Sequence, residues 1–249
     1  AVAGSLLSIL LCLLMPTSSA EQRNDDSKPE TGSRSNFDGI MGVVKSVWPL
    51  LCAKTITSVG NSMAAATLPL VLKNTYGFNE QGLGTSMSVI SGFNALVNGV
   101  LLAPIVAFHG GGLVRVIRNC LIGMTLLYLL QFIVVGAILD GMPLILSGAY
   151  PFLVTCVFLS MHQYVLSTVI TAESTALVDE SAKGTLLGLE HSLFAAARIV
   201  SPQLGVLILQ TAGIQGVSGA CCGVFFSVYI GWTLTHIPET SCKGEKKEH

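Results

Sequence analysis

The chain has very little charge for its length. Of its 249 residues only 11% are Asp, Glu, Lys or Arg, against about 25% in soluble domains. Hydrophobic residues make up 51% of the sequence, and the mean hydropathy is +0.68. The net charge is −1, so the basic surface that a nucleic-acid partner requires is missing. This composition excludes an ordinary soluble domain and indicates a membrane protein.

The sequence also lacks the short motifs that mark common enzymes. It contains no Gly-x-Ser-x-Gly, no His-Glu-x-x-His and no Walker phosphate loop. The seven cysteines form no Cys-x-x-Cys pair, and six of them lie in apolar segments, which is typical of small packing residues. We therefore expect no enzyme, no catalytic residues, no cofactor and no metal site. An ATP-driven pump is likewise unsupported.

Long apolar runs fill most of the chain. Short breaks, among them residues 109–112 and 211–213, separate them. Because backbone polar groups must be satisfied inside a bilayer, each run of about 20 residues is predicted to be a helix. The sequence thus predicts an all-α polytopic protein with six transmembrane helices. The predicted apolar segments are 47–72, 83–108, 114–138, 143–170, 186–210 and 216–236.

The flanking regions differ from this apolar pattern. Residues 1–16 are apolar and are expected to be the end of a preceding transmembrane helix. A secretory signal peptide is the alternative, since Ser18-x-Ala20 resembles a cleavage site. Residues 17–45 are polar and predict a cytoplasmic linker. Residues 46–238 would hold the six helices, and residues 239–249 a charged cytoplasmic tail.

The distribution of Lys and Arg predicts the orientation. If residues 17–45 are cytoplasmic and the spans alternate, ten loop cations lie on the cytoplasmic side and only Lys73 lies on the other. Such a bias is the positive-inside signal of a multi-pass protein with both ends of the six-helix segment in the cytoplasm. The ten are Arg23, Lys28, Arg34, Lys45, Arg115, Arg118, Lys183, Lys243, Lys246 and Lys247.

The two remaining cations lie within apolar segments. Arg198 is about 12 residues into its span, hence about 18 Å from the end, whereas Lys54 is only about seven residues in. A charge in the bilayer costs several kcal/mol, so Arg198 is expected to face a carboxylate, a solute or water. Lys54 is expected to pair with a carboxylate outside this helix set, or to snorkel. Both are candidates for contact with a substrate, ion coupling or gating.

Other polar residues in the apolar segments are weaker candidates. Glu190 is predicted to reach the interface as a surface or gating carboxylate. His162 and Gln163 form a polar cluster with Tyr164. For Asn61 and Asn94, we expect hydrogen bonds between helices more than a cavity-lining role. The substrate or coupling candidates are therefore Arg198, Lys54, Glu190, His162, Gln163, Asn61 and Asn94.

Small residues at steps of four predict one smooth helix face. Gly184 and Gly188 begin this stripe, which favours close packing of another helix. Pro202 is expected to kink the same helix. Arg115 follows the glycines of the 109–112 loop and is a gating candidate.

Three stretches carry a family resemblance. Gly184-Thr185-Leu186-Leu187-Gly188-Leu189 precedes Ala197-Arg198-Ile199-Val200-Ser201-Pro202, and Leu51-Cys52-Ala53-Lys54 precedes Asn61. They resemble the C-terminal half of a major facilitator superfamily transporter, in the organic-cation-transporter-like and tetracycline-antiporter-like branch. Two departures are Ser201, where a Gly usually precedes the Pro, and the loop before Arg115, which lacks the family's Asp.

The resemblance implies a function for the chain in a lipid bilayer. It implies secondary transport of a small organic solute by alternating access, an organic cation or drug-like amine, with protons as the antiported ion. The partner would be an N-terminal six-helix half of the same chain. Because Lys54 and Arg198 are both cationic, an organic-anion carrier is one alternative. A membrane scaffold or sensor that transports nothing is the other.

Overall fold

A computed structural model describes residues 33–139 and 148–235. The chain forms two units, Ala1–Asn36 and Phe37–His249, and the long apolar helices belong to the second. The preceding helix end predicted for residues 1–16 and the tail predicted for residues 239–249 lie outside the described residues. The linker predicted for residues 17–45 is not a loop throughout, because residues 33–45 are helical.

Every regular element in the described residues is a helix. The elements are α2 (Ser33–Asn74), α3 (Glu80–Leu96), the π-helical turn η1 (Val97–Leu101), α4 (Leu102–Phe108), α5 (Leu113–Leu139), α7 (Ala149–Ala176) and α8 (Glu180–Thr235). The prediction of an all-α protein is confirmed for this part of the chain.

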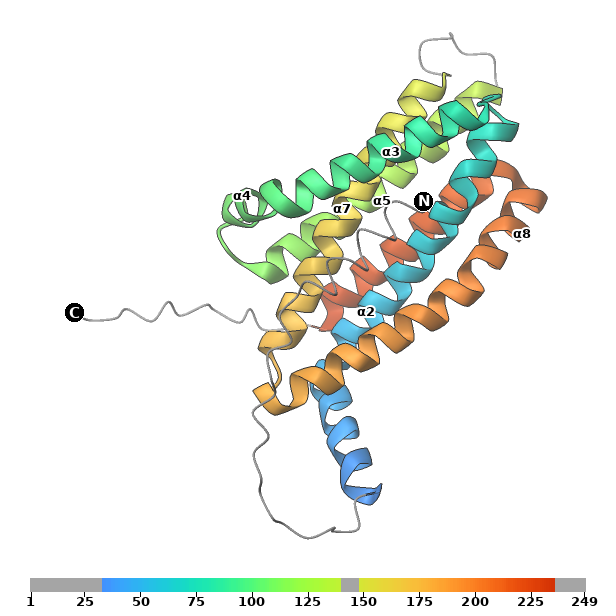
Figure 1. Ribbon diagram of the computed structural model, residues 1–249. Coiled ribbons are helices and arrows are strands. Elements are labelled where there is room, and N and C mark those ends of the chain that lie inside the picture. The colour runs from blue at the N-terminus through green and yellow to red at the C-terminus, as the bar shows by residue number, and fades with distance from the viewer. Residues whose placement is uncertain (1–32, 140–147, 236–249) are drawn as a thin grey trace, which may run out of the picture. The chain divides into compact units, whose positions relative to one another are not determined.

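Five helices of the described residues are long and apolar enough to cross a membrane, not six. They are Val47–Asn74, Glu80–Phe108, Leu113–Val134, Ala149–Ala176 and Glu180–Thr235. The difference arises in α8, whose 56 residues include both of the last two predicted segments. A straight helix of that length would measure about 84 Å, against about 30 Å for the hydrocarbon core. Gly213 interrupts α8 with φ 65° and ψ −164°, and Figure 1 shows the chain turning back there.

Local sequence signals explain the other element boundaries. Asn79 caps α3, since its side-chain oxygen accepts a hydrogen bond from the Gly82 N–H at 2.8 Å. Pro104 lacks the N–H that would bond residue 100, and the helix widens into η1 just before it. Gly110 and Gly111 turn the chain into α5 with φ of 72° each. The predicted loop at residues 109–112 is therefore confirmed.

The core of this unit lies around α5. Leu121 and Met124 are fully buried there, and α5 packs against both α7 and α8. Tyr128 stacks on Phe225 of α8 with ring centroids 5.4 Å apart. Beside the core, α8 approaches α2 so closely that a Cβ added at Gly205 would lie 2.9 Å from the Met63 carbonyl oxygen. Many large apolar side chains outside this core are exposed, as in a protein surrounded by lipid. Together with the five candidate spans, this indicates an integral multi-pass membrane protein.

Candidate functional site

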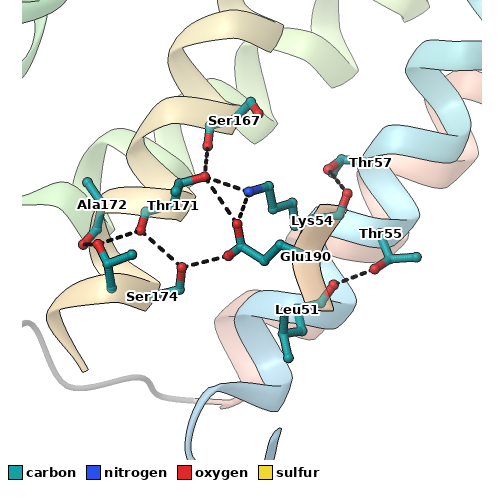
Figure 2. A network of polar contacts seen from close by, with 10 residues as sticks. Leu51, Lys54, Thr55, Thr57, Ser167, Thr171, Ala172, Ser174 and Glu190 are labelled. Atoms are coloured by element: carbon teal, nitrogen blue, oxygen red, sulfur yellow. Dashed lines mark hydrogen bonds and ion pairs between the residues drawn. The ribbon is translucent and has the colours of Figure 1, made fainter. Parts of the chain in front are cut away.

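A buried ion pair and its hydrogen-bond partners join three of the apolar helices. Lys54 of α2 forms an ion pair with Glu190 of α8 through Nζ and Oε2. Figure 2 shows the two side chains pointing toward each other, with Thr171 and Ser174 of α7 beside them. The Glu190 side chain is only 3% exposed and that of Lys54 16%. The prediction that Glu190 reaches the interface is therefore wrong, and Lys54 finds its carboxylate within this helix set.

Hydroxyl groups of α7 complete the network. The Lys54 Nζ donates to Thr171 Oγ1 at 2.5 Å, and Ser174 Oγ lies 2.7 Å from Glu190 Oε1. Each hydroxyl also has an acceptor on its own helix. Thr171 Oγ1 is 3.0 Å from the Ser167 carbonyl oxygen, and Ser174 Oγ is 3.0 Å from that of Thr171. Positions 167, 171 and 174 share one helix face, so α7 presents a polar strip to the ion pair.

The ion pair has further polar neighbours with unused hydrogen-bonding capacity. Ser58 and Gln163 line a small void of about 10 Å³ next to Lys54. Neither Ser58 Oγ nor Gln163 Oε1, both buried atoms, has a hydrogen-bond partner in the described residues. Phe194 lines the same void. A charged pair with several uncharged polar groups at its side is thus enclosed between α2, α7 and α8.

Arg198 lies outside this network. It is exposed on α8, with its guanidinium 4.6 Å from the centre of the Phe194 ring, a cation–π contact. Arg198 forms no ion pair with the described residues, and its neighbour Ile199 is 71% exposed. Phe194 also borders the void beside Lys54, so the same residue contacts Arg198 and lines the surroundings of the buried cation.

A mostly apolar cavity of about 170 Å³ lies between α2, α3, α5, α7 and α8, with a few polar residues in its wall. Asn61 lines it and is half-buried. Gln131 is buried in its wall and accepts a hydrogen bond from Ser218 at 3.3 Å. Behind the wall, the Asn94 amide donates to Ser160 Oγ at 3.3 Å. Asn94 therefore forms a hydrogen bond between α3 and α7, the role expected for these asparagines, whereas Asn61 lines the cavity.

The remaining predicted residues are dispersed. His162 bonds the Phe158 carbonyl oxygen at 2.8 Å and packs against Gly123, away from Gln163. Gly184 and Gly188 are exposed, and a Cβ added at either would meet nothing within 4 Å. The close packing predicted for these glycines is thus not found in the described residues.

The two remaining predicted residues, Pro202 and Arg115, also lie outside the ion-pair network. The helix α8 continues through Pro202. Arg115 reaches back from α5, with Nη1 3.5 Å from the His109 carbonyl oxygen, so it contacts the α4–α5 loop and is distant in sequence from the ion-pair network.

Sequence reasoning missed the hydroxyl residues and one carboxylate. Thr171, Ser174 and Ser58 look like ordinary small polar residues in apolar runs, and only their spacing on a helix face could have drawn attention to them. Glu173 belongs to an acidic stretch that the sequence predicts as a break, but it lies inside α7 and is 1% exposed. The described residues contain no group of three His, Cys, Asp or Glu that could hold a metal ion.

Comparison with known proteins does not place the chain in a family. The chain matches no protein-family model, no curated protein and no solved structure. The function must therefore be argued from the buried ion pair, the cavity and Arg198.

Proposed function

We propose that this chain is part of a secondary transporter that moves a small organic solute across a membrane by alternating access. In this proposal the two limbs of α8 on either side of Gly213 are separate spans, which gives six. The observation that carries the proposal is Arg198, a charge exposed on an otherwise apolar helix beside the exposed Ile199. Because a lipid-facing arginine at that depth is costly, this face of α8 must meet water, a polar solute or an acidic partner.

The solute could be an organic cation or an organic anion, and a different argument supports each. The family resemblance implies an organic cation or drug-like amine, with proton antiport. The geometry gives a specific reason for an organic anion, because Lys54 is neutralised by Glu190 whereas Arg198 is exposed. Guanidinium groups bind carboxylates through paired hydrogen bonds that an ammonium cannot reproduce. Arg198 is therefore assigned as the charged group that contacts the solute or gates its path.

Flux measurements in vesicles with an imposed pH gradient test this proposal. Radiolabelled organic cations and organic anions of matched size are offered to the wild type and to Arg198→Lys and Arg198→Ala. We expect flux in the wild type and its loss in both variants, with normal abundance of the Lys variant. Lys183→Ala, which removes a partly exposed cation at the start of α8, is the matched control. Flux at wild-type rate in Arg198→Lys would reduce Arg198 to a counter-ion, and no flux of either class would favour a scaffold.

A further inference from the structure

The cavity of about 170 Å³ beside Asn61 has the size of a small organic ring. A dry engineered cavity of about 150 Å³ in another protein binds benzene. Apolar side chains form most of the lining, with Tyr128 and Phe152 among them, and no described Asp, Glu, Lys or Arg contributes to it. A charged group would therefore enter without a counter-charge, at a high desolvation cost. Size and lining both favour an uncharged ring.

The wall of the cavity also offers a hydrogen-bond donor. Ser160 lines the cavity and accepts from the Asn94 amide at 3.3 Å. The Ser160 hydroxyl itself donates to no described residue. Asn94 occupies one lone pair of that hydroxyl, so it restricts the directions in which the hydrogen can point. By contrast, Gln131 already accepts from Ser218 and donates to the neighbouring Thr155 at 3.4 Å.

The cavity has an open side at α2. Asn61 is half-buried, and Ala65, which also lines the cavity, is exposed. The Asn61 amide makes no hydrogen bond to the described residues. A molecule can therefore enter past a free amide with its ring directed inward.

We propose that this cavity binds the uncharged ring of an organic solute that carries an acceptor oxygen, which accepts a hydrogen bond from Ser160. The inference rests on the proposed transport function and names the part of the solute that the cavity takes. Asn94 is a positioning residue, since it acts through Ser160.

Four probes of similar size test the proposal. Acetophenone carries a neutral acceptor, ethylbenzene carries none, and benzoate and benzylammonium carry opposite charges. The chain is reconstituted in nanodiscs, and binding is measured as a saturable shift of the thermal unfolding midpoint at equal bilayer concentration of each probe. We expect acetophenone to bind about fivefold more tightly than ethylbenzene, the range of one hydrogen bond. The two charged probes should give no saturable shift.

Variants then locate the binding. Ser160→Ala should bring the acetophenone-to-ethylbenzene ratio to about one, whereas Ser227→Ala, at an exposed hydroxyl on α8, should leave it unchanged. Ala64→Met should fill the cavity and abolish both shifts, while Ala95→Met, at an exposed position of α3, should not. An unchanged ratio in Ser160→Ala, or binding of a charged probe as tight as that of acetophenone, would overturn the inference.

Binding and flux fail in different ways. If no probe gives a saturable shift while wild-type flux is present, the cavity inference is wrong and transport stands. If the probes bind as expected but no solute is carried, the cavity remains a ligand site and transport is wrong.

Discussion

The Lys54–Glu190 pair allows a quantitative test of how α2 is held to α7 and α8. The perturbation is a double-mutant cycle of Lys54→Met, Glu190→Leu and the two together. Lys54→Met leaves a carboxylate that is 3% exposed with only hydroxyl partners. Removing one partner of a buried pair costs about 3–5 kcal/mol. Glu190→Leu should cost somewhat less, because the Lys54 side chain is 16% exposed and keeps Thr171 as an acceptor.

The double variant should recover most of the lost stability. With both charges gone, the Thr171 and Ser174 hydroxyls keep acceptors on their own helix at 3.0 Å each. No buried charge or hydroxyl of this group is then unpaired, and replacing a buried pair by apolar side chains is often close to neutral. We therefore expect a coupling free energy of at least about 3 kcal/mol between positions 54 and 190.

The assay is the free energy of unfolding of the purified chain in bicelles, measured by denaturant titration of helix content. The control cycle uses Lys183 and Glu180, an exposed pair three residues apart on α8. Its coupling should stay below about 0.5 kcal/mol. If the two effects at positions 54 and 190 add within about 0.5 kcal/mol, the ion pair does not hold these helices together and the reasoning fails.

Predictions at three further positions can be checked by the same unfolding measurement. The Tyr76 hydroxyl is buried with no hydrogen-bond partner in the described residues, so Tyr76→Phe should stabilise the chain by up to about 1 kcal/mol. Burial raises the pKa of Tyr76, so the wild type should lose stability above about pH 10, the ordinary tyrosine pKa, and Tyr76→Phe should lose less. Gly213→Ala should cost about 1–3 kcal/mol because its φ of 65° is strained for any side chain, whereas Gly223→Ala, in open helix, should be neutral or stabilising. Gly205→Ala should destabilise because the added Cβ would lie 2.9 Å from the Met63 carbonyl oxygen, and Gly188→Ala should not, since a Cβ there would meet no described atom within 4 Å.

Apolar runs and turn residues predicted the helices, because burial of apolar surface and backbone hydrogen bonding act locally along the chain. The break at Gly213 and the loop at residues 109–112 were predictable for the same reason. The pairing of Lys54 with Glu190 was not, since these residues are 136 positions apart in sequence and their contact depends on which faces of α2 and α8 meet. The glycines show the same limit. The stripe of Gly184 and Gly188 signals close packing, but the contact forms at Gly205 instead.

The arrangement of α2 and α8 relates the exposed charge to the cavity. Lys54 meets Glu190, and further along both helices Met63 meets Gly205, so α2 and the first limb of α8 run in the same direction. At 1.5 Å per residue, Arg198 lies about 12 Å beyond Glu190 and Asn61 about 10 Å beyond Lys54. The exposed cation and the open side of the cavity are therefore at similar depth. With the charge of Lys54 neutralised, Arg198 would select the charged end of an amphiphilic solute, while the cavity beside Asn61 would select its uncharged ring. On this reasoning Arg198→Ala should abolish flux without changing which ring binds in the cavity. Ser160→Ala should change the ring preference without changing which charge is carried.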